Sequence, residues 1–488
     1  MSTPNSTTLG QLKKSGYVSK SIKNELRDNL IAKIESGETV FPGIVGFDDT
    51  VIPDVERAIL SRHNVLLLGL RGQAKTRIAR QLVGLLDEYI PVISGSELND
   101  DPLQPMSRTA IDLVKELGDK TPIEWMHRDE RYVEKLATPD VSVADLIGDV
   151  DPIKAATLKL PYSDERTIHF GLIPRAHRCI FVINELPDLQ ARIQVSLFNI
   201  LQEGDIQIRG FKLRLQLDIQ FLFTANPEDY TNRGSIITPL KDRIESQILT
   251  HYPTELDLAK KITAQEANLL ETQKERVFVP DFLHTILETI VFKARSSEFV
   301  DEKSGVSARL SISAYENLVS AAERRAIRNK ETKVQARIQD FWGIIPAITG
   351  KIELVYEGEQ EGPYNVAIKL IGEAMKDVFL SVFPDPSKLK GDEDPYGIIR
   401  SWFGGGNVVS IYNEDSEADF RQNLESIAGL KRLAETVKIE GADDLLLMEL
   451  ILHGLTETDV LNRDFIDKKM EFKDVLAGML NDDIFGDN

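Results

Sequence analysis

The chain has 488 residues, enough for about three domains, and 42% of them are hydrophobic, so it can bury a sizeable core. Its formal net charge of −20 argues against general coating of nucleic acid, which requires positive charge to neutralise phosphates. The single cysteine, Cys179, excludes an internal disulfide, and its apolar surroundings favour core packing over nucleophilic chemistry.

The first residues of the chain show no targeting signal. Met1–Thr8 are polar and lack the apolar centre of a signal peptide. No apolar run approaches the length of a membrane span. We therefore expect a soluble, cytoplasmic protein without a membrane partner.

Residues 1–35 are polar, and a helix is expected over about residues 19–36. The strongest motif follows at Gly69–Thr76, which reads GLRGQAKT. An apolar run at 64–68 predicts a buried strand before it, and helical spacing of apolar residues at 77–86 predicts a helix after it. Strand, glycine-rich turn, Lys-Thr and helix form the context of a phosphate-binding loop.

The residue types of this loop suit phosphate chemistry. Glycines let backbone N–H groups converge on an anion, and the start of the helix adds partial positive charge. Lys75 would reach the β- and γ-phosphates of a nucleotide, and the Thr76 hydroxyl would bind Mg²⁺. The usual pattern has Gly before the Lys, and here Ala74 is expected to hold the helical conformation. The alternative is a tight turn of an ordinary α/β protein, which the flanking elements disfavour.

Two further segments are expected before the next motif. Tyr89–Ile93 predicts a second strand. Residues 94–145 are polar and too long for an ordinary loop, so they form either an insertion or a functional segment.

The buried-strand run Cys179–Ile183 ends in Asn184 and Glu185. Acidic residues in this position hold Mg²⁺ and polarise the attacking water in P-loop ATPases. Asn184 keeps a carbonyl oxygen without the charge, so we expect a more weakly held metal, whereas Glu185 keeps a catalytic carboxylate. The alternative is that both residues only cap a helix expected from Asp188.

A hairpin and a further strand follow this helix. Apolar and polar residues alternate on both sides of residues 209–210, which predicts the hairpin. Its turn carries the basic residues Arg209, Lys212 and Arg214. These could contact a substrate or nucleic acid; the alternative is a solvated turn. The strand at 219–226 ends in Asn226, whose amide could orient the attacking water.

Two arginines are candidates for contacts with a nucleotide. Arg243 precedes the end of the α/β region and could enter a neighbouring subunit's site as an arginine finger, although an Arg near an Asp is usually a surface ion pair. Arg309 begins a helix and could contact the γ-phosphate. The later helices are expected at 255–276, 281–294, 312–327, 363–383 and 420–437.

Taken in order, these motifs resemble those of AAA+ ATPases, most closely the ATPase (I) subunit of magnesium chelatase and the MoxR-type ATPases. The resemblance covers about residues 40–325. Four segments carry it beside the P-loop: Asp145–Asp151, Phe170–Arg178, Asn199–Asn226 and the Asn-Pro-Glu-Asp that begins at Asn226.

The resemblance implies a role for each matched residue. Gly46 lies near the adenine; Gly69, Gly72, Lys75 and Thr76 form Walker A; Asn184 and Glu185 form Walker B; Asn226 is sensor 1, Arg243 the arginine finger and Arg309 sensor 2. It also implies ATP and Mg²⁺ as cofactors, and a ring of identical subunits, expected to be a hexamer. Family members work with a protein that carries a von Willebrand A domain; no Asp-x-Ser-x-Ser stands in this chain, so that domain is expected in a separate protein.

The expected fold is an α/β P-loop AAA+ core, with a parallel sheet flanked by helices, followed by a helical lid and a mainly helical C-terminal region. The expected segments are an N-terminal helical extension at 1–35, the AAA+ core at 36–252, the lid at 253–330 and the C-terminal region at 331–488.

The leading hypothesis is an ATP-driven ring motor that remodels a partner protein, with metal chelation as a special case. A second is a nucleotide-binding scaffold whose hydrolysis is weakened by Asn184. A sigma-54-type activator is disfavoured because its Gly-Ala-Phe-Thr-Gly-Ala loop is absent, and a helicase-like motor is disfavoured by the net charge.

Overall fold

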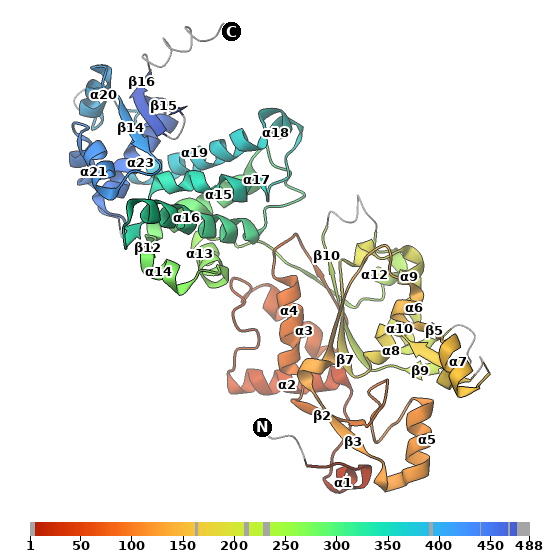
Figure 1. Cartoon of the computed structure of the whole chain (residues 1–488). Coiled ribbons are helices and arrows are strands. Elements are labelled where there is room, and N and C mark those ends of the chain that lie inside the picture. Colours follow the sequence, from red (N-terminus) through yellow and green to blue (C-terminus); the bar gives the residue numbers. More distant parts are fainter. Residues whose placement is uncertain are drawn as a thin grey trace. The chain divides into compact units, whose positions relative to one another are not determined.

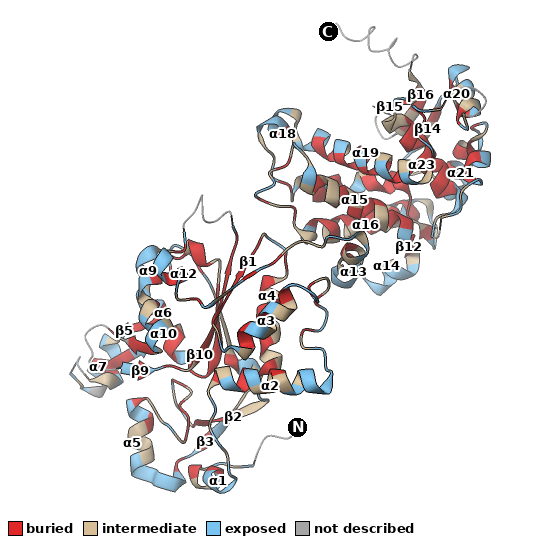
Figure 2. Ribbon diagram, turned by 180° about the vertical axis from the view of Figure 1, so that it is seen from behind, coloured by how far each residue is buried: buried red, intermediate tan, exposed pale blue. Residues whose placement is uncertain are grey.

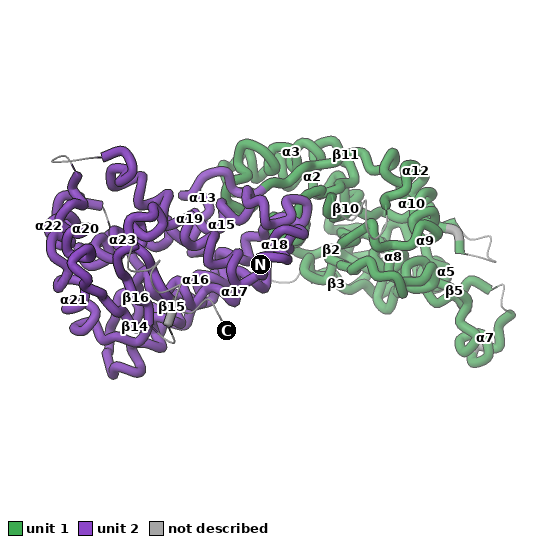
Figure 3. Tube along the Cα trace, turned by 90° about the horizontal axis from the view of Figure 1, so that it is seen from above, with its two compact units in different colours: residues 1–251 green, residues 252–488 purple. Residues whose placement is uncertain are grey.

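The computed structural model describes residues 5–161, 164–208, 214–227, 235–389, 394–439, 441–466 and 469–475. The chain divides into two compact units, residues 1–251 and 252–488 (Figure 3). The four-segment division made from the sequence remains a prediction.

Unit 1 is built on a five-stranded parallel sheet (Figure 1). The order of its strands is β11 (Ser246–Leu249), β1 (Val65–Leu68), β10 (Ile219–Ala225), β7 (Cys179–Asn184) and β4 (Tyr132–Leu136). The predicted α/β class with a parallel sheet is therefore confirmed.

Alternate residues of the central strands enter two different cores, because successive side chains of a strand point to opposite faces. Val65 and Leu67 pack with the helices of one face, whereas Leu66 and Phe223 pack with those of the other. Both faces are covered and the three central strands, β1, β10 and β7, are almost entirely buried (Figure 2), which explains their nearly continuous apolar sequence. The covering helices are α2 (Ile22–Ser36), α3 (Val51–Leu60) and α4 (Lys75–Gln81) on the first face, and α9 (Ala191–Ser196) and α10 (Phe198–Glu203) on the second.

The strand predicted at Tyr89–Ile93 is present as β2, but it lies outside the main sheet. β2 (Tyr89–Ile93) pairs with β3 (Ile123–His127) in a separate antiparallel ribbon. The fifth strand of the main sheet is β4, inside the 94–145 segment that was expected to be an insertion or a functional loop. β4 is an edge strand with two charged residues, so its sequence gave little strand signal.

The helix predicted from Asp188 is also divided, into a short 3₁₀ turn at Leu186–Asp188 and the helices α9 and α10. The predicted hairpin is present as β8 (Asp205–Gln207) and β9 (Arg214–Gln216). Its turn, with Arg209 and Lys212, lies outside the described residues, and Arg214 is exposed.

The smaller elements of unit 1 are α1 (Leu9–Lys14), η1 (Leu82–Leu85), α5 (Arg108–Leu117), η2 (Gly118–Lys120), η3 (Arg128–Arg131), α6 (Val143–Leu146), β5 (Gly148–Val150), α7 (Pro152–Leu158), η4 (Glu165–Thr167), β6 (Ile168–Phe170), α8 (Leu172–Arg175) and α12 (Thr238–Lys241).

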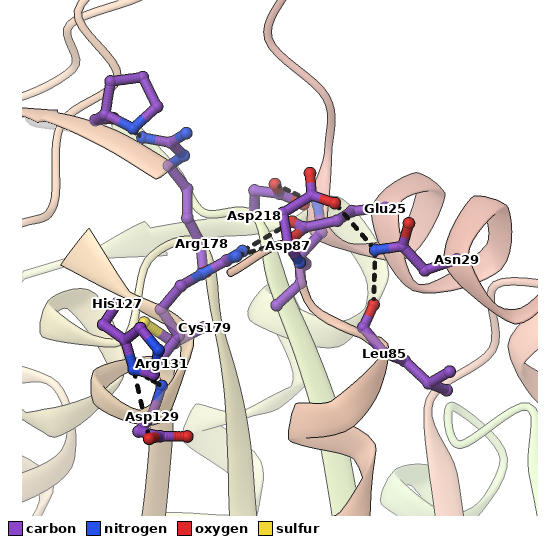
Figure 4. A network of polar contacts seen from close by, with 12 residues as sticks. Glu25, Asn29, Leu85, Asp87, His127, Asp129, Arg131, Arg178, Cys179 and Asp218 are labelled. Carbon is purple, nitrogen blue, oxygen red and sulfur yellow. Dashed lines mark hydrogen bonds and ion pairs between the residues drawn. The ribbon is translucent and has the colours of Figure 1, made fainter. Parts of the chain in front are cut away.

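A buried ion pair fastens the N-terminal helix α2 to the sheet (Figure 4). Glu25 on α2 accepts hydrogen bonds from both terminal nitrogens of Arg131 at 2.6 and 2.7 Å, and from the backbone N–H of Asp87 at 2.7 Å. The Nε of Arg131 donates to the carbonyl of Arg178 at 3.0 Å. The side chains of Glu25 and Arg131 are 4% and 1% exposed, so each charge depends on the other for its stabilisation.

We expect Arg131→Met to lower the free energy of unfolding of unit 1 by about 3–5 kcal/mol, because it leaves the Glu25 carboxylate buried without its partner. The double variant Glu25→Leu/Arg131→Met should recover most of this loss. Urea denaturation of both variants measures the difference. A loss below about 1 kcal/mol in the single variant would contradict this account of the pair.

Cys179 begins β7 and is buried. Burial raises the pKa of its thiol to about 12. The thiol is thus protonated at neutral pH, as the core-packing interpretation predicts.

Unit 2 is mainly helical around one hydrophobic core, as predicted for the C-terminal half of the chain. α15 (Asp281–Ser296) packs against α16 (Ala308–Asn329) and α19 (Pro363–Val382), and α19 packs against α23 (Asp444–Glu457) (Figure 1). The core therefore joins the predicted lid to the predicted C-terminal region. The helices are α13 (Leu256–Glu266), α14 (Glu271–Arg276), α15 (Asp281–Ser296), α16 (Ala308–Asn329), η6 (Ile338–Ile344), α17 (Ile345–Thr349), α18 (Tyr356–Glu361), α19 (Pro363–Val382), α20 (Gly397–Gly404), α21 (Glu417–Glu425), α22 (Leu430–Ala434) and α23 (Asp444–Glu457).

Unit 2 also contains strands that the sequence analysis missed. β14 (Val409–Tyr412), β16 (Lys469–Asp474) and β15 (Leu461–Ile466) form an antiparallel sheet in that order. β12 (Val277–Phe278) and β13 (Val334–Gln335) form a short parallel pair. Two predicted helices, 255–276 and 420–437, are each interrupted. Across the described parts of both units, the helices are too short or too polar to cross a membrane.

Candidate nucleotide-binding site

The predicted phosphate-binding loop connects the end of β1 to the start of α4. The N–H of Gly69 donates to the carbonyl of Ala225 at 3.1 Å, which ties the loop to the end of β10. A Cβ on Gly69 would lie 2.0 Å from the Thr250 hydroxyl and 2.2 Å from Oε1 of Gln73, so only glycine fits there. Gly72 has a φ of +74°, a conformation that glycine adopts without strain.

Ala74 differs from the expectation made for it. Its φ and ψ are 55° and 12°, which is the left-handed helical conformation rather than the ordinary helical one. The left-handed conformation costs an L-residue about 1–2 kcal/mol relative to glycine. A non-glycine residue keeps this conformation only where the surrounding structure holds it.

The Lys75 side chain is 8% exposed and folds over the loop. Its ammonium donates to the carbonyls of Gly69 and Leu70, the latter at 2.8 Å, and to Oδ1 of Asn226 at 2.8 Å. Thr76 follows in the first turn of α4 and is half-buried. Lysine, threonine and Asn226 therefore stand at the carboxyl end of the sheet, where ligands of open α/β sheets bind.

Asn226 links the loop to Glu185. Because the Lys75 ammonium can only donate, it fixes Oδ1 of Asn226 as the acceptor and turns the amide nitrogen toward Glu185. That nitrogen donates to Oε2 of Glu185 at 2.7 Å. The ends of β1, β10 and β7 thus contribute one continuous chain of hydrogen bonds, Lys75–Asn226–Glu185.

Glu185 is half-buried and has a φ of 55°. It precedes the 3₁₀ turn at Leu186–Asp188, but its side chain makes no capping hydrogen bond to that turn. The carboxylate contacts Asn226 instead, so the helix-cap alternative does not account for it. As at Ala74, a strained backbone accompanies a residue of the site.

Asn184 lies between two polar neighbours. Its amide nitrogen donates to Oε1 of Glu134, and its Oδ1 accepts a hydrogen bond from the Thr224 hydroxyl at 3.1 Å. Oε2 of Glu134 accepts from Nε and Nη2 of Arg80 on α4, both at 3.1 Å. Sequence reasoning missed Glu134, because β4 was not expected: residues 132–136 do not alternate between apolar and polar side chains, so no local signal marked the strand.

Gly46 has a φ of +80°, which places it in a turn beside the end of β11. The neighbouring Phe47 ring lies edge-on to the His251 ring with centroids 5.0 Å apart, and Nε2 of His251 is 2.8 Å from the Thr50 hydroxyl. His251 follows Thr250, whose hydroxyl donates to Gln73 of the loop at 2.7 Å. The Gly46 turn therefore lies close to the phosphate-binding loop.

The two candidate arginines lie in different units of the chain. Arg243 lies over the Phe198 ring at 4.9 Å and donates to Oε1 of Gln202 at 3.1 Å and to the carbonyl of Pro239 at 2.7 Å. Arg309 is exposed in the first turn of α16, which belongs to unit 2.

The side-chain oxygens at this site suit a hard cation such as Mg²⁺. The described residues contain no group of three or more His, Cys, Asp and Glu side chains that could hold a metal by themselves. The oxygens of Thr76 and Asn184 are the kind of ligand that Mg²⁺ takes together with water and substrate phosphates. The residues present therefore fit a nucleotide-bound Mg²⁺ rather than a metal held by protein alone.

Comparison with known proteins gave no matching family model. The chain is similar to the subunits BchI and BchD of magnesium chelatase, with 19% identity, a TM-score of 0.33, and coverage of 66% of this chain and 98% of that one. It is also similar to NtrX from Brucella abortus, with 14% identity, a TM-score of 0.38 and coverage of 82% and 72%, and to Hsp104, with 13% identity, a TM-score of 0.38 and coverage of 64% and 50%.

Proposed function

We propose that the chain binds Mg-ATP at the β1–α4 loop and hydrolyses it as a ring-forming ATPase of the AAA+ type, which remodels a partner protein. The observation that supports this most is the hydrogen-bonded chain Lys75–Asn226–Glu185. It supports the proposal because an ammonium, an amide and a carboxylate are joined at the ends of three adjacent strands, and these are groups suited to bind phosphate, orient a water and accept its proton.

Each residue has a defined task in this proposal. The loop N–H groups and Lys75 bind the phosphates, and Thr76 and Asn184 hold Mg²⁺, which would neutralise phosphate charge when bound. Asn226 holds a water in line with the γ-phosphorus, and Glu185 accepts its proton as the water oxygen attacks. The β–γ bridging oxygen leaves with ADP.

The place of Asn226 depends on the strand order. β10 lies between β1, which carries the loop, and β7, which carries Glu185. A water beside Asn226 can therefore lie between the γ-phosphate and the Glu185 carboxylate. We further propose a homo-hexamer in the cytoplasm and a separate protein with a von Willebrand A domain as partner, as the resemblance implies.

A nucleotide-binding scaffold is the second candidate, and one observation favours it: Asn184 stands where a P-loop ATPase keeps an aspartate. Weak hydrolysis with normal ATP binding would distinguish this candidate. A metal-chelatase reaction is the more specialised version of the first candidate.

We expect Arg243→Ala to keep ATP binding and to lower hydrolysis by about 10³-fold, because an arginine finger acts on a neighbouring subunit's nucleotide. A mixing experiment tests this: Glu185→Gln and Arg243→Ala chains, each inactive, are assembled together at equal concentration. In mixed rings about a quarter of the sites combine an intact Glu185 with a neighbour's intact Arg243, so activity should return. Full turnover by Arg243→Ala alone, or no recovery in the mixture, would remove Arg243 from the neighbouring site.

A further inference from the structure

Asn184 and Glu134 lie on neighbouring strands and point to the same face of the sheet. Leu136 is the register partner of Asn184 on β4, and Glu134 stands two residues earlier, on the same face as Leu136. This is the face covered by α4, which begins with Lys75 and Thr76. A carboxylate therefore stands next to the position at which the charge of a Walker B aspartate is missing.

The contacts of Asn184 fix the orientation of its amide. A carboxylate only accepts hydrogen bonds, so the Asn184 group that faces Glu134 is the NH₂. The Thr224 hydroxyl accepts the N–H of Glu185 at 3.2 Å and donates its own proton to Oδ1 of Asn184 at 3.1 Å. Both neighbours thus favour the same orientation, in which the carbonyl oxygen is turned away from Glu134.

The Glu134 carboxylate lies in a partly buried place, with 23% of its side chain exposed. Burial and the neighbouring Glu134 carboxylate raise the pKa of Tyr132, so that hydroxyl stays protonated and donates to Glu134 at 3.3 Å. Arg80 also binds Glu134, but the Arg80 side chain is 65% exposed, and exposed ion pairs contribute little.

We propose that Glu134 is a positioning residue for Mg²⁺: it holds the Asn184 amide with its oxygen available to the hydrated metal, and it supplies the negative charge that Asn184 lacks. This inference rests on the proposed function of the site. In this arrangement the negative charge of the Walker B aspartate is not lost: Glu134 on the adjacent strand β4 carries it, and Asn184 on β7 supplies the oxygen.

Asn184→Asp would restore the aspartate that a P-loop ATPase keeps at this position. That change places a second carboxylate within hydrogen-bond distance of Glu134, and the like charges repel each other. Asn184→Asp alone should therefore not strengthen Mg²⁺ binding. The exchanged pair Glu134→Gln/Asn184→Asp restores one carboxylate and one amide and should work nearly as well as the natural pair.

The test measures binding of a fluorescent ATP analogue to the full chain as a function of Mg²⁺ concentration, and again in EDTA. Glu134→Gln should raise the Mg²⁺ concentration needed for half-maximal tightening about 10–100-fold, the usual effect of removing a group that supports a metal ligand. Binding in EDTA should stay unchanged, and the exchanged pair should return to within about threefold of the natural chain. Arg80→Gln, which removes the ion pair but keeps Glu134, is the control and should leave the Mg²⁺ dependence unchanged.

An unchanged Mg²⁺ dependence in Glu134→Gln would overturn the proposal. So would an equal loss in Arg80→Gln, which would assign the effect to the ion pair with α4, or a failure of the exchanged pair to restore binding while its circular dichroism shows a folded chain. A natural chain that binds no ATP analogue with or without Mg²⁺ would instead overturn the proposed function itself, and this inference with it.

Discussion

Glu185→Gln is expected to lower kcat for ATP hydrolysis by about 10²–10⁴-fold and to leave ATP affinity in place, because the amide cannot accept the proton of the attacking water. Glutamine has nearly the same shape and can still accept the hydrogen bond that Asn226 now gives to Oε2 of Glu185 at 2.7 Å. The substitution thus removes the base with little change in packing.

Steady-state hydrolysis and equilibrium ATP binding, measured on the same preparation, separate these two effects. Glu203→Gln is a matched control, because Glu203 is an exposed acid at the end of α10. A kcat within twofold of the natural chain in Glu185→Gln would show that another group accepts the proton.

Lys75→Ala should weaken ATP binding by roughly 100-fold or more, since hydrogen bonds to charged groups contribute about 1.5–3 kcal/mol each. The ammonium is 8% exposed and already lies against the loop carbonyls and Asn226, so it is held where phosphates would bind. Lys75→Met, which keeps the aliphatic stem, separates loss of charge from loss of packing.

Isothermal titration with ATP in the presence of Mg²⁺ measures this affinity. Lys261→Ala, a change at an exposed lysine of α13, should bind ATP as the natural chain does. Unchanged affinity in both Lys75 variants would overturn the assignment of Gly69–Thr76 as a phosphate-binding loop.

The parts of the site that were predicted from sequence are those coded by contiguous residues. Gly69–Thr76 carries its own strand, turn and helix signals, so its place at the end of β1 follows from local pattern. Asn184, Glu185 and Asn226 each end an apolar run, and parallel strands bring such ends to one edge of the sheet. The contact of Asn226 with both Lys75 and Glu185 agrees with that reasoning.

The parts that were missed depend on contacts between distant residues. Glu134 could not be assigned because nothing local shows that β4, rather than β2, pairs with β7. Ala74 has a residue type that favours ordinary helix, and only the structure shows its left-handed backbone. The β14 strand pairs with β16 near the C-terminus, a long-range pairing that short apolar runs do not reveal.

The measurement that tests the central claim most directly is steady-state Mg-ATP hydrolysis by the purified chain over a series of protein concentrations, with Lys75→Ala as the blank. The account predicts activity that rises more steeply than linearly with protein concentration, because a neighbouring subunit completes each site, and that vanishes in the blank. Activity equal to that of the Lys75→Ala blank at every concentration, from a chain that still binds ATP, would contradict it.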